Sequence, residues 1–115
     1  MQPVIQDIFL ETENVIELKR GDIGVDKLVF HLFRDGDPYE LSGTQSVQMK
    51  VYLERFSGIG FTMKKGATDN EIVGNVISKL TANEGRFPAD IIISDFLSGR
   101  QVFHNIIFSV TDEEE

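Results

Sequence analysis

The chain has no cysteine and no tryptophan among its 115 residues, and only three prolines and two histidines. Without cysteine it can form no disulfide, no thiolate metal site and no cysteine nucleophile. No apolar run reaches the roughly 18 residues that a membrane-spanning helix needs. The amino terminus also lacks the basic segment and apolar stretch of a signal peptide. We therefore expect no membrane partner.

Basic residues are also few: the chain has 11 Lys and Arg against 19 Asp and Glu, which gives a formal net charge of −8. Phosphate backbones are bound by clustered Lys and Arg, so we expect no nucleic-acid partner. Half of the net charge comes from residues 112–115, which read DEEE. We interpret these four residues as an acidic tail or the start of a linker.

What the sequence has is alternation of apolar and polar residues with a period of two, which predicts strands. The clearest strand is 47–54, where Val47, Met49, Val51 and Leu53 share one face. Three further clear strands carry these inward rows: Leu28, Phe30 and Leu32; Phe87, Ala89, Ile91 and Ile93; Val102, His104, Ile106, Phe108 and Val110. Weaker strands are predicted at 15–19, 61–64 and 72–79, and a possible edge strand at 5–10.

Turn residues separate these strands, and the pair Asp35-Gly36 is a typical hairpin signal. The pattern predicts an all-β fold: an antiparallel β-sandwich of about seven to eight strands, immunoglobulin-like in general architecture. Residues 1–111 form a single domain, with 1–13 as a possible edge strand or arm. A short helix within 68–80 is the alternative, although the Val, Ile and Gly content there disfavours it.

No catalytic or metal-binding template is matched. The sequence contains no Gly-x-Ser-x-Gly and no His-Glu-x-x-His motif. The acidic residues Asp35, Asp37 and Glu40 lack the order of a calcium-binding EF-hand loop, so we interpret them as a solvated hairpin. His104 in an apolar row is interpreted as a hydrogen-bonded core or edge residue. We therefore expect no enzyme activity, no cofactor and no metal.

Apolar residues in predicted loops are the remaining candidates for a binding surface. Phe96 and Leu97 lie at a predicted hairpin tip, and Phe56 and Ile59 lie in a glycine-rich loop. Such residues either fold back over the end of the sandwich or mark a contact surface. We take these four residues as the candidate interface.

Several segments, taken in order, resemble one known family. They are residues 18–22 (LKRGD), 35–43 (DGDPYELSG), 85–93 (GRFPADIII), 98–102 (SGRQV) and the closing 108–110 (FSV). Together they resemble the N-terminal domain of phage baseplate upper proteins, from siphophages of Gram-positive hosts, over residues 14–110. Phe87 and Ser42 replace the family's usual Tyr and Thr, and 56–61 lacks its typical Lys-Pro-Asp-Gly. The last departure leaves the pairing of the middle strands open.

The resemblance implies a mechanical role in the virion, at the phage tail baseplate. Such domains are adaptors that dock on the distal tail protein and support receptor-binding proteins, and the full-length proteins form homo-oligomers. The alternative function is a carbohydrate-binding or adhesion module that contacts the host cell surface. That alternative would need exposed aromatic platforms, for which the chain offers only Tyr39 and Tyr52 as tyrosines.

The assignment of inward faces is testable. Phe108→Ala and Ile91→Ala should each lower the free energy of unfolding by roughly 3–5 kcal/mol, because each removes a large side chain from the core. Urea denaturation measures the change. A loss below about 1 kcal/mol, which is usual for surface positions, would show that the face assignment is wrong.

Overall fold

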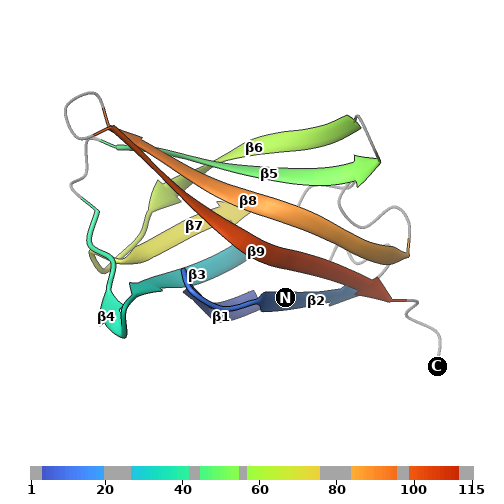
Figure 1. The fold of residues 1–115 in the computed structure, drawn as a ribbon, viewed down its shortest axis with the longest axis horizontal. Coiled ribbons are helices and arrows are strands. Elements are labelled where there is room, and N and C mark those ends of the chain that lie inside the picture. Colours follow the sequence, from blue (N-terminus) through green and yellow to red (C-terminus); the bar gives the residue numbers. More distant parts are fainter. Residues whose placement is uncertain are drawn as a thin grey trace.

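The computed structural model describes residues 4–19, 27–41, 45–54, 57–75, 84–95 and 99–111. Its regular elements are all strands (Figure 1): β1 Val4–Phe9, β2 Asn14–Lys19, β3 Lys27–Arg34, β4 Asp37–Pro38, β5 Ser46–Glu54, β6 Ser57–Lys65, β7 Glu71–Asn75, β8 Gly85–Asp95 and β9 Gly99–Thr111. The all-β prediction is confirmed. Residues 71–75 form a strand where a helix was the alternative, and 76–80 lie outside the described residues.

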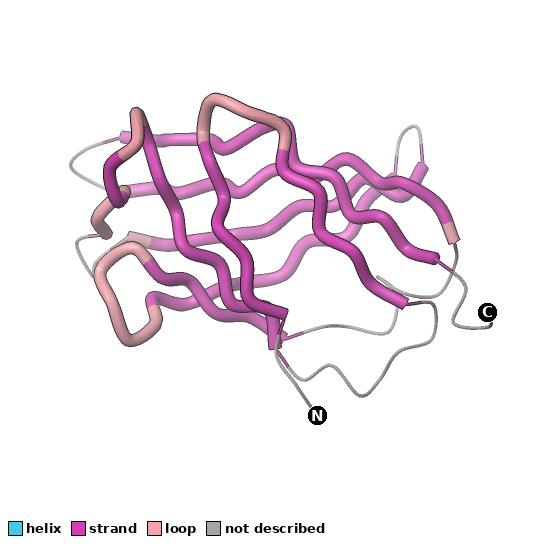
Figure 2. Tube along the Cα trace, turned by 90° about the horizontal axis from the view of Figure 1, so that it is seen from below, coloured by secondary structure: helices cyan, strands magenta, loops and turns pink. Residues whose placement is uncertain are grey.

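The strands form one continuous sheet in the order β1-β3-β7-β6-β5-β8-β9-β2, with the short β4 pairing off this path with β3. The sheet curls around a common core, so β1 and β2, its two ends, lie near each other (Figures 1 and 2). The ladders are antiparallel, as predicted, except at these ends. There β1 runs parallel to β3 and β2 runs parallel to β9.

The predicted inward rows form most of the core. In β3, β5 and β8 the buried side chains are Leu28, Phe30, Leu32, Val47, Met49, Val51, Ala89, Ile91 and Ile93. The edge strands add Ile8 from β1 and Ile16 and Leu18 from β2. Phe108 and Ile91 are both fully buried. Alternation therefore identified the core faces of these central strands correctly.

The closing strand β9 differs from the prediction in its first half. Ile106, Phe108 and Val110 point inward as expected, but Phe103 is buried and His104 is exposed. The β8–β9 register shifts between Ala89↔Ile106 and Ile91↔Phe103, and Asn105 has a φ of 62°. This β-bulge inserts one extra residue and reverses the inward face. The prediction that Val102 and His104 line the core is therefore wrong.

The crossover from β1 to β2 depends on Asn14, the one polar residue that is buried in the described part of the chain. Its side-chain amide accepts a hydrogen bond from the Phe9 N–H and donates to the Phe9 carbonyl, both at 2.9 Å. It also donates to the Thr12 carbonyl at 2.9 Å. The Gln6 side chain adds a further link, donating to the Val15 carbonyl at 2.7 Å. These bonds hold the two ends of the sheet together.

Asn14→Ala should lower the free energy of unfolding by about 2–4 kcal/mol, because it removes three hydrogen bonds and leaves the partly buried N–H and carbonyl of Phe9 without partners. Urea denaturation measures the change. Gln48→Ala, at an exposed position of β5, is the control and should stay within about 0.5 kcal/mol of the parent. Equal stability of the two variants would contradict the role given to Asn14.

Candidate interaction surfaces

The predicted loop interface is only partly within the described residues. Phe56, Phe96 and Leu97 lie outside them. Ile59 is in strand β6 and not in a loop, and it pairs with Val51 of β5. Its side chain is half-buried and packs against the core. The interface at these four residues therefore stays a prediction.

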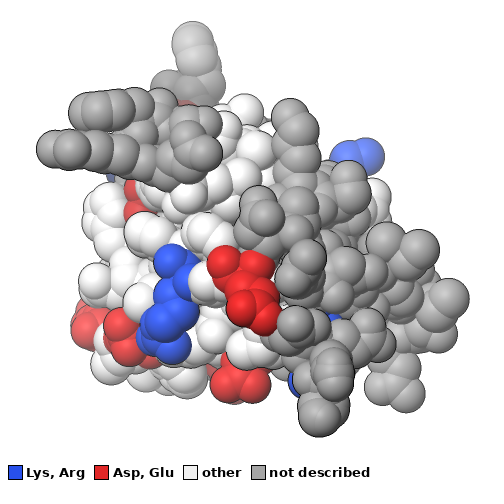
Figure 3. Space-filling view, turned by 90° about the vertical axis from the view of Figure 1, so that its right-hand side faces the viewer, with Lys and Arg blue, Asp and Glu red and all other residues white. Residues whose placement is uncertain are grey.

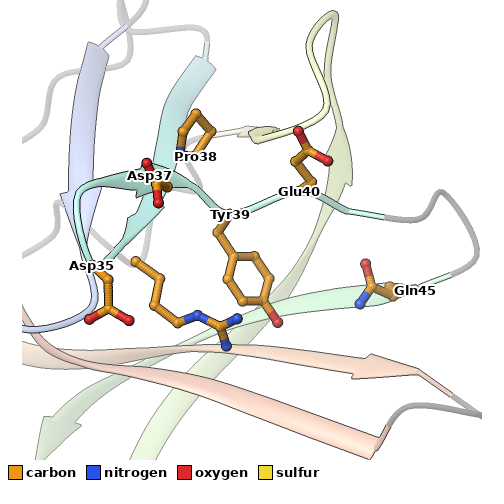
Figure 4. A pocket seen from close by; sticks show the side chains of 7 residues that line it. Asp35, Asp37, Pro38, Tyr39, Glu40 and Gln45 are labelled. Atoms are coloured by element: carbon orange, nitrogen blue, oxygen red, sulfur yellow. The ribbon is translucent and has the colours of Figure 1, made fainter.

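The first surface feature is a hollow of about 500 Å³ beside the β3–β4 hairpin (Figure 4). The predicted turn is present, since Asp35 and Gly36 have φ values of 54° and 83°, as a type I′ turn requires. The hollow is lined by the acidic side chains Asp35, Asp37 and Glu40 together with Arg34 and Tyr39. It therefore offers both hydrogen-bond donors and acceptors, but little open apolar surface.

Tyr39 in this hollow is already engaged by its neighbours. The Arg34 guanidinium lies over its ring, 5.2 Å from the centroid. The ring also packs edge-to-face against Phe103, with centroids 5.4 Å apart. A sugar would stack on a free aromatic face, and the cation covers one face here. The geometry is more typical of a packed strand end than of a glycan platform.

The second feature is a polar cluster on the outer face of β5, β8 and β9. Asp90 accepts a hydrogen bond from the Tyr52 hydroxyl at 3.0 Å and one from His104 Nδ1 at 2.9 Å. The Lys50 ammonium lies over the Tyr52 ring, 5.3 Å from its centroid. The β9 bulge brings His104 to this face, which sequence alternation could not reveal. The carboxylate is therefore satisfied by two neighbours.

The hydrogen bond to Asp90 raises the pKa of the Tyr52 phenol, because the neutral hydroxyl donates to the carboxylate. Desolvation and the negative charge of Asp90 raise that pKa further, while Arg100 opposes them. The cluster supplies one imidazole and one carboxylate. Across the described ranges no three His, Cys, Asp or Glu side chains are placed so that they could hold a metal ion.

The third feature is the outer face of β1, β3 and β7, which carries Ile5 and Phe9. Their side chains are 63% and 38% exposed, and they are the exposed large hydrophobic residues of the described chain. Phe9 stacks on Phe33 of β3, with ring centroids 5.3 Å apart. The sequence did carry a signal for this surface: β1 is apolar on both faces, with Ile8 facing the core. A strand at the edge of a sheet needs only one apolar face, the one that packs on the core.

Charge is mixed over the end of the molecule opposite the hairpin. Figure 3 shows basic side chains there directly beside acidic ones. A shallow hollow at this end is lined by residues of β8 and β9, among them Arg86, Ser109 and Thr111. The described part of this surface therefore carries both signs of charge.

No helix of the described residues is both long and apolar enough to cross a membrane.

Comparison with known proteins identifies the fold. No family model and no curated protein matches the sequence. Among solved structures, the N-terminal domain of phage TP901-1 ORF48 is similar, with a TM-score of 0.72 and 11% sequence identity. The match covers 97% of this chain and 100% of that one. ORF48 is a baseplate protein, so the resemblance to baseplate N-terminal domains is confirmed at the level of the fold.

The Tyr52–Asp90 bond makes a pH-dependent prediction. In a Tyr39→Phe background, Asp90→Asn should lower the pKa of Tyr52 toward its ordinary value, as read by phenolate absorbance. Because the folded-state pKa is raised, the stability from this bond is present below the ordinary tyrosine pKa and is lost at higher pH. An unchanged titration in the Asp90→Asn variant would show that the bond does not control Tyr52.

Proposed function

We propose that this chain is a structural domain of a phage tail baseplate and acts as an adaptor. It would dock on the distal tail protein and support receptor-binding proteins in the virion, without catalysing a reaction. The observation that carries the proposal is the shared fold, which spans nearly the whole of this chain and all of the ORF48 domain. A match of that extent is a match of the complete fold and not of one common β-motif.

Four described residues of the sequence resemblance support the proposal because each has a structural place in this fold. Gly36 completes the β3–β4 turn, and Pro38 pairs with Phe33 across that hairpin. Leu41 is 6% exposed and joins the core. Gly85 begins β8 with a φ of 145°, and a Cβ there would meet the Phe87 ring at 3.0 Å. These four motif residues thus serve turns, strand pairing and the core, which explains why they recur in a shared fold.

The polar groups of the surface also favour assembly over catalysis. The Asp90 carboxylate accepts hydrogen bonds from Tyr52 and His104 on an open sheet face. A carboxylate that acts as a general base must instead be within reach of a substrate proton. Both tyrosines have a cation over the ring, Arg34 on Tyr39 and Lys50 on Tyr52. This arrangement makes the carbohydrate-binding alternative the weaker one.

Mixing this chain with the distal tail protein of the same phage should give a complex that elutes earlier than either protein alone. Size-exclusion chromatography with light scattering should show a mass increased by multiples of 13.0 kDa. A distal tail protein from an unrelated phage is the control and should leave the two peaks separate. Separate peaks with the cognate protein, both partners being folded by circular dichroism, would contradict the adaptor role.

A further inference from the structure

The outer face of β1, β3 and β7 consists of three parallel rows, which the strand register defines. We call it the β1–β3–β7 face. Its first row is apolar: Ile5, Val29 and Val73. Its second row is polar: Asp7, His31 and Glu71. Its third row is again apolar: Phe9, Phe33 and Pro38.

The apolar rows are continuous and open to solvent. Ile5 and Phe9 are exposed, while Val29 and Phe33 beside them are half-buried, so each row presents a broad apolar strip. Ile5 and Phe9 stay 63% and 38% exposed, so folding alone buries only part of their apolar surface. Contiguous exposed apolar surface with a polar component is typical of a protein contact.

The polar row between them is acidic. His31 Nε2 is 3.3 Å from Glu71, and its Nδ1 is 3.9 Å from Asp7. Whether the imidazole is neutral or protonated, two carboxylates leave the row with a net negative charge. Glu71 is held in place, since it accepts a hydrogen bond from the Ala67 N–H and its side chain is only 15% exposed. Asp7 is 58% exposed and is the carboxylate that a partner can reach.

The exposed lysines nearest to this face do not neutralise the polar row. Lys64 pairs with Val73 and so lies in register with the first apolar row. Lys27 lies one row further out, paired with Asn75. A partner that covers the face must therefore supply a positive charge between two apolar contacts.

A second copy of this chain does not meet that requirement when its polar row stacks on the polar row of the first. In a two-fold dimer the same surface meets itself, so each residue of one copy faces a residue of the same patch in the other. With its axis through His31, along the row or along the strands, such a dimer would place each Asp7 against Asp7 or Glu71 of the other copy. Like charges facing each other across an interface disfavour that pairing.

We propose that the β1–β3–β7 face is the surface on which the distal tail protein docks, through a Lys or Arg flanked by apolar side chains. The cation would meet Asp7, and the apolar side chains would cover the rows of Ile5 and Phe9. The inference rests on the proposed baseplate function and adds the surface and the chemistry of the partner.

The test compares single substitutions for binding to the distal tail protein by isothermal titration calorimetry. Ile5→Glu should weaken binding at least tenfold, because it adds a negative charge and removes an apolar contact. Gln48→Glu adds the same charge at an exposed position of β5 outside the face and should leave the dissociation constant within twofold. Both positions are exposed, so both variants should keep the parent melting temperature.

The charge requirement is tested separately at Asp7. Asp7→Lys should weaken binding at least tenfold at low salt, Asp7→Asn should weaken it less, and high salt should reduce both differences by screening. If the parent chain binds but neither Ile5→Glu nor Asp7→Lys differs from it, the docking surface is wrong while the adaptor role stands. If the parent does not bind at all, the adaptor role fails and this inference with it. A dimer of this chain alone that Ile5→Glu dissociates would show that a second copy covers the face.

Discussion

The two ends of the sheet are held together by two side-chain amides, of which the buried Asn14 makes the most bonds and Gln6 adds one. The chain leaves β1 at one end of the strand order and enters β2 at the other end within five residues, between Phe9 and Asn14. Phe9 pairs with Phe33 of β3, and its backbone N–H and carbonyl both bond to the Asn14 amide, which supplies one acceptor and one donor. Buried backbone groups need such partners. The parallel pairings of β1 with β3 and β2 with β9 both depend on this crossing.

The crossing and the β9 bulge together account for where the surface chemistry lies. The crossing fixes β1 beside β3 with Ile8 inward, which turns Ile5 and Phe9 outward as an apolar strip around an acidic row. On the opposite part of the sheet, the β9 bulge turns His104 outward onto Asp90, where the polar groups satisfy each other. The described surface therefore combines a self-contained polar cluster with an unpartnered apolar face. That distribution suits a domain that functions by assembly.

Much of this fold was predictable because alternation is a local property of the chain. The strand at 47–54, the inward rows of β3 and β8, and the turn at Asp35-Gly36 follow from residue order alone. The family resemblance predicted the shared fold for a related reason. Its motif residues, such as Gly36 and Gly85, occupy turns and strand starts whose positive φ values favour glycine.

Only the tertiary structure decided the features that depend on pairing between distant segments. A bulge is defined by two residues opposing one on a neighbouring strand, so no pattern within β9 could show that Phe103 and not His104 enters the core. The parallel direction of β1 and β2, and the burial of Asn14, likewise follow from which strands they meet. The sequence by itself determined that strands form, which residues of the central strands face inward and that cysteine chemistry is absent. The contacts between strands decided which faces of the other strands stay exposed. Exposure depends on the neighbouring strands, and the local residue pattern does not identify these.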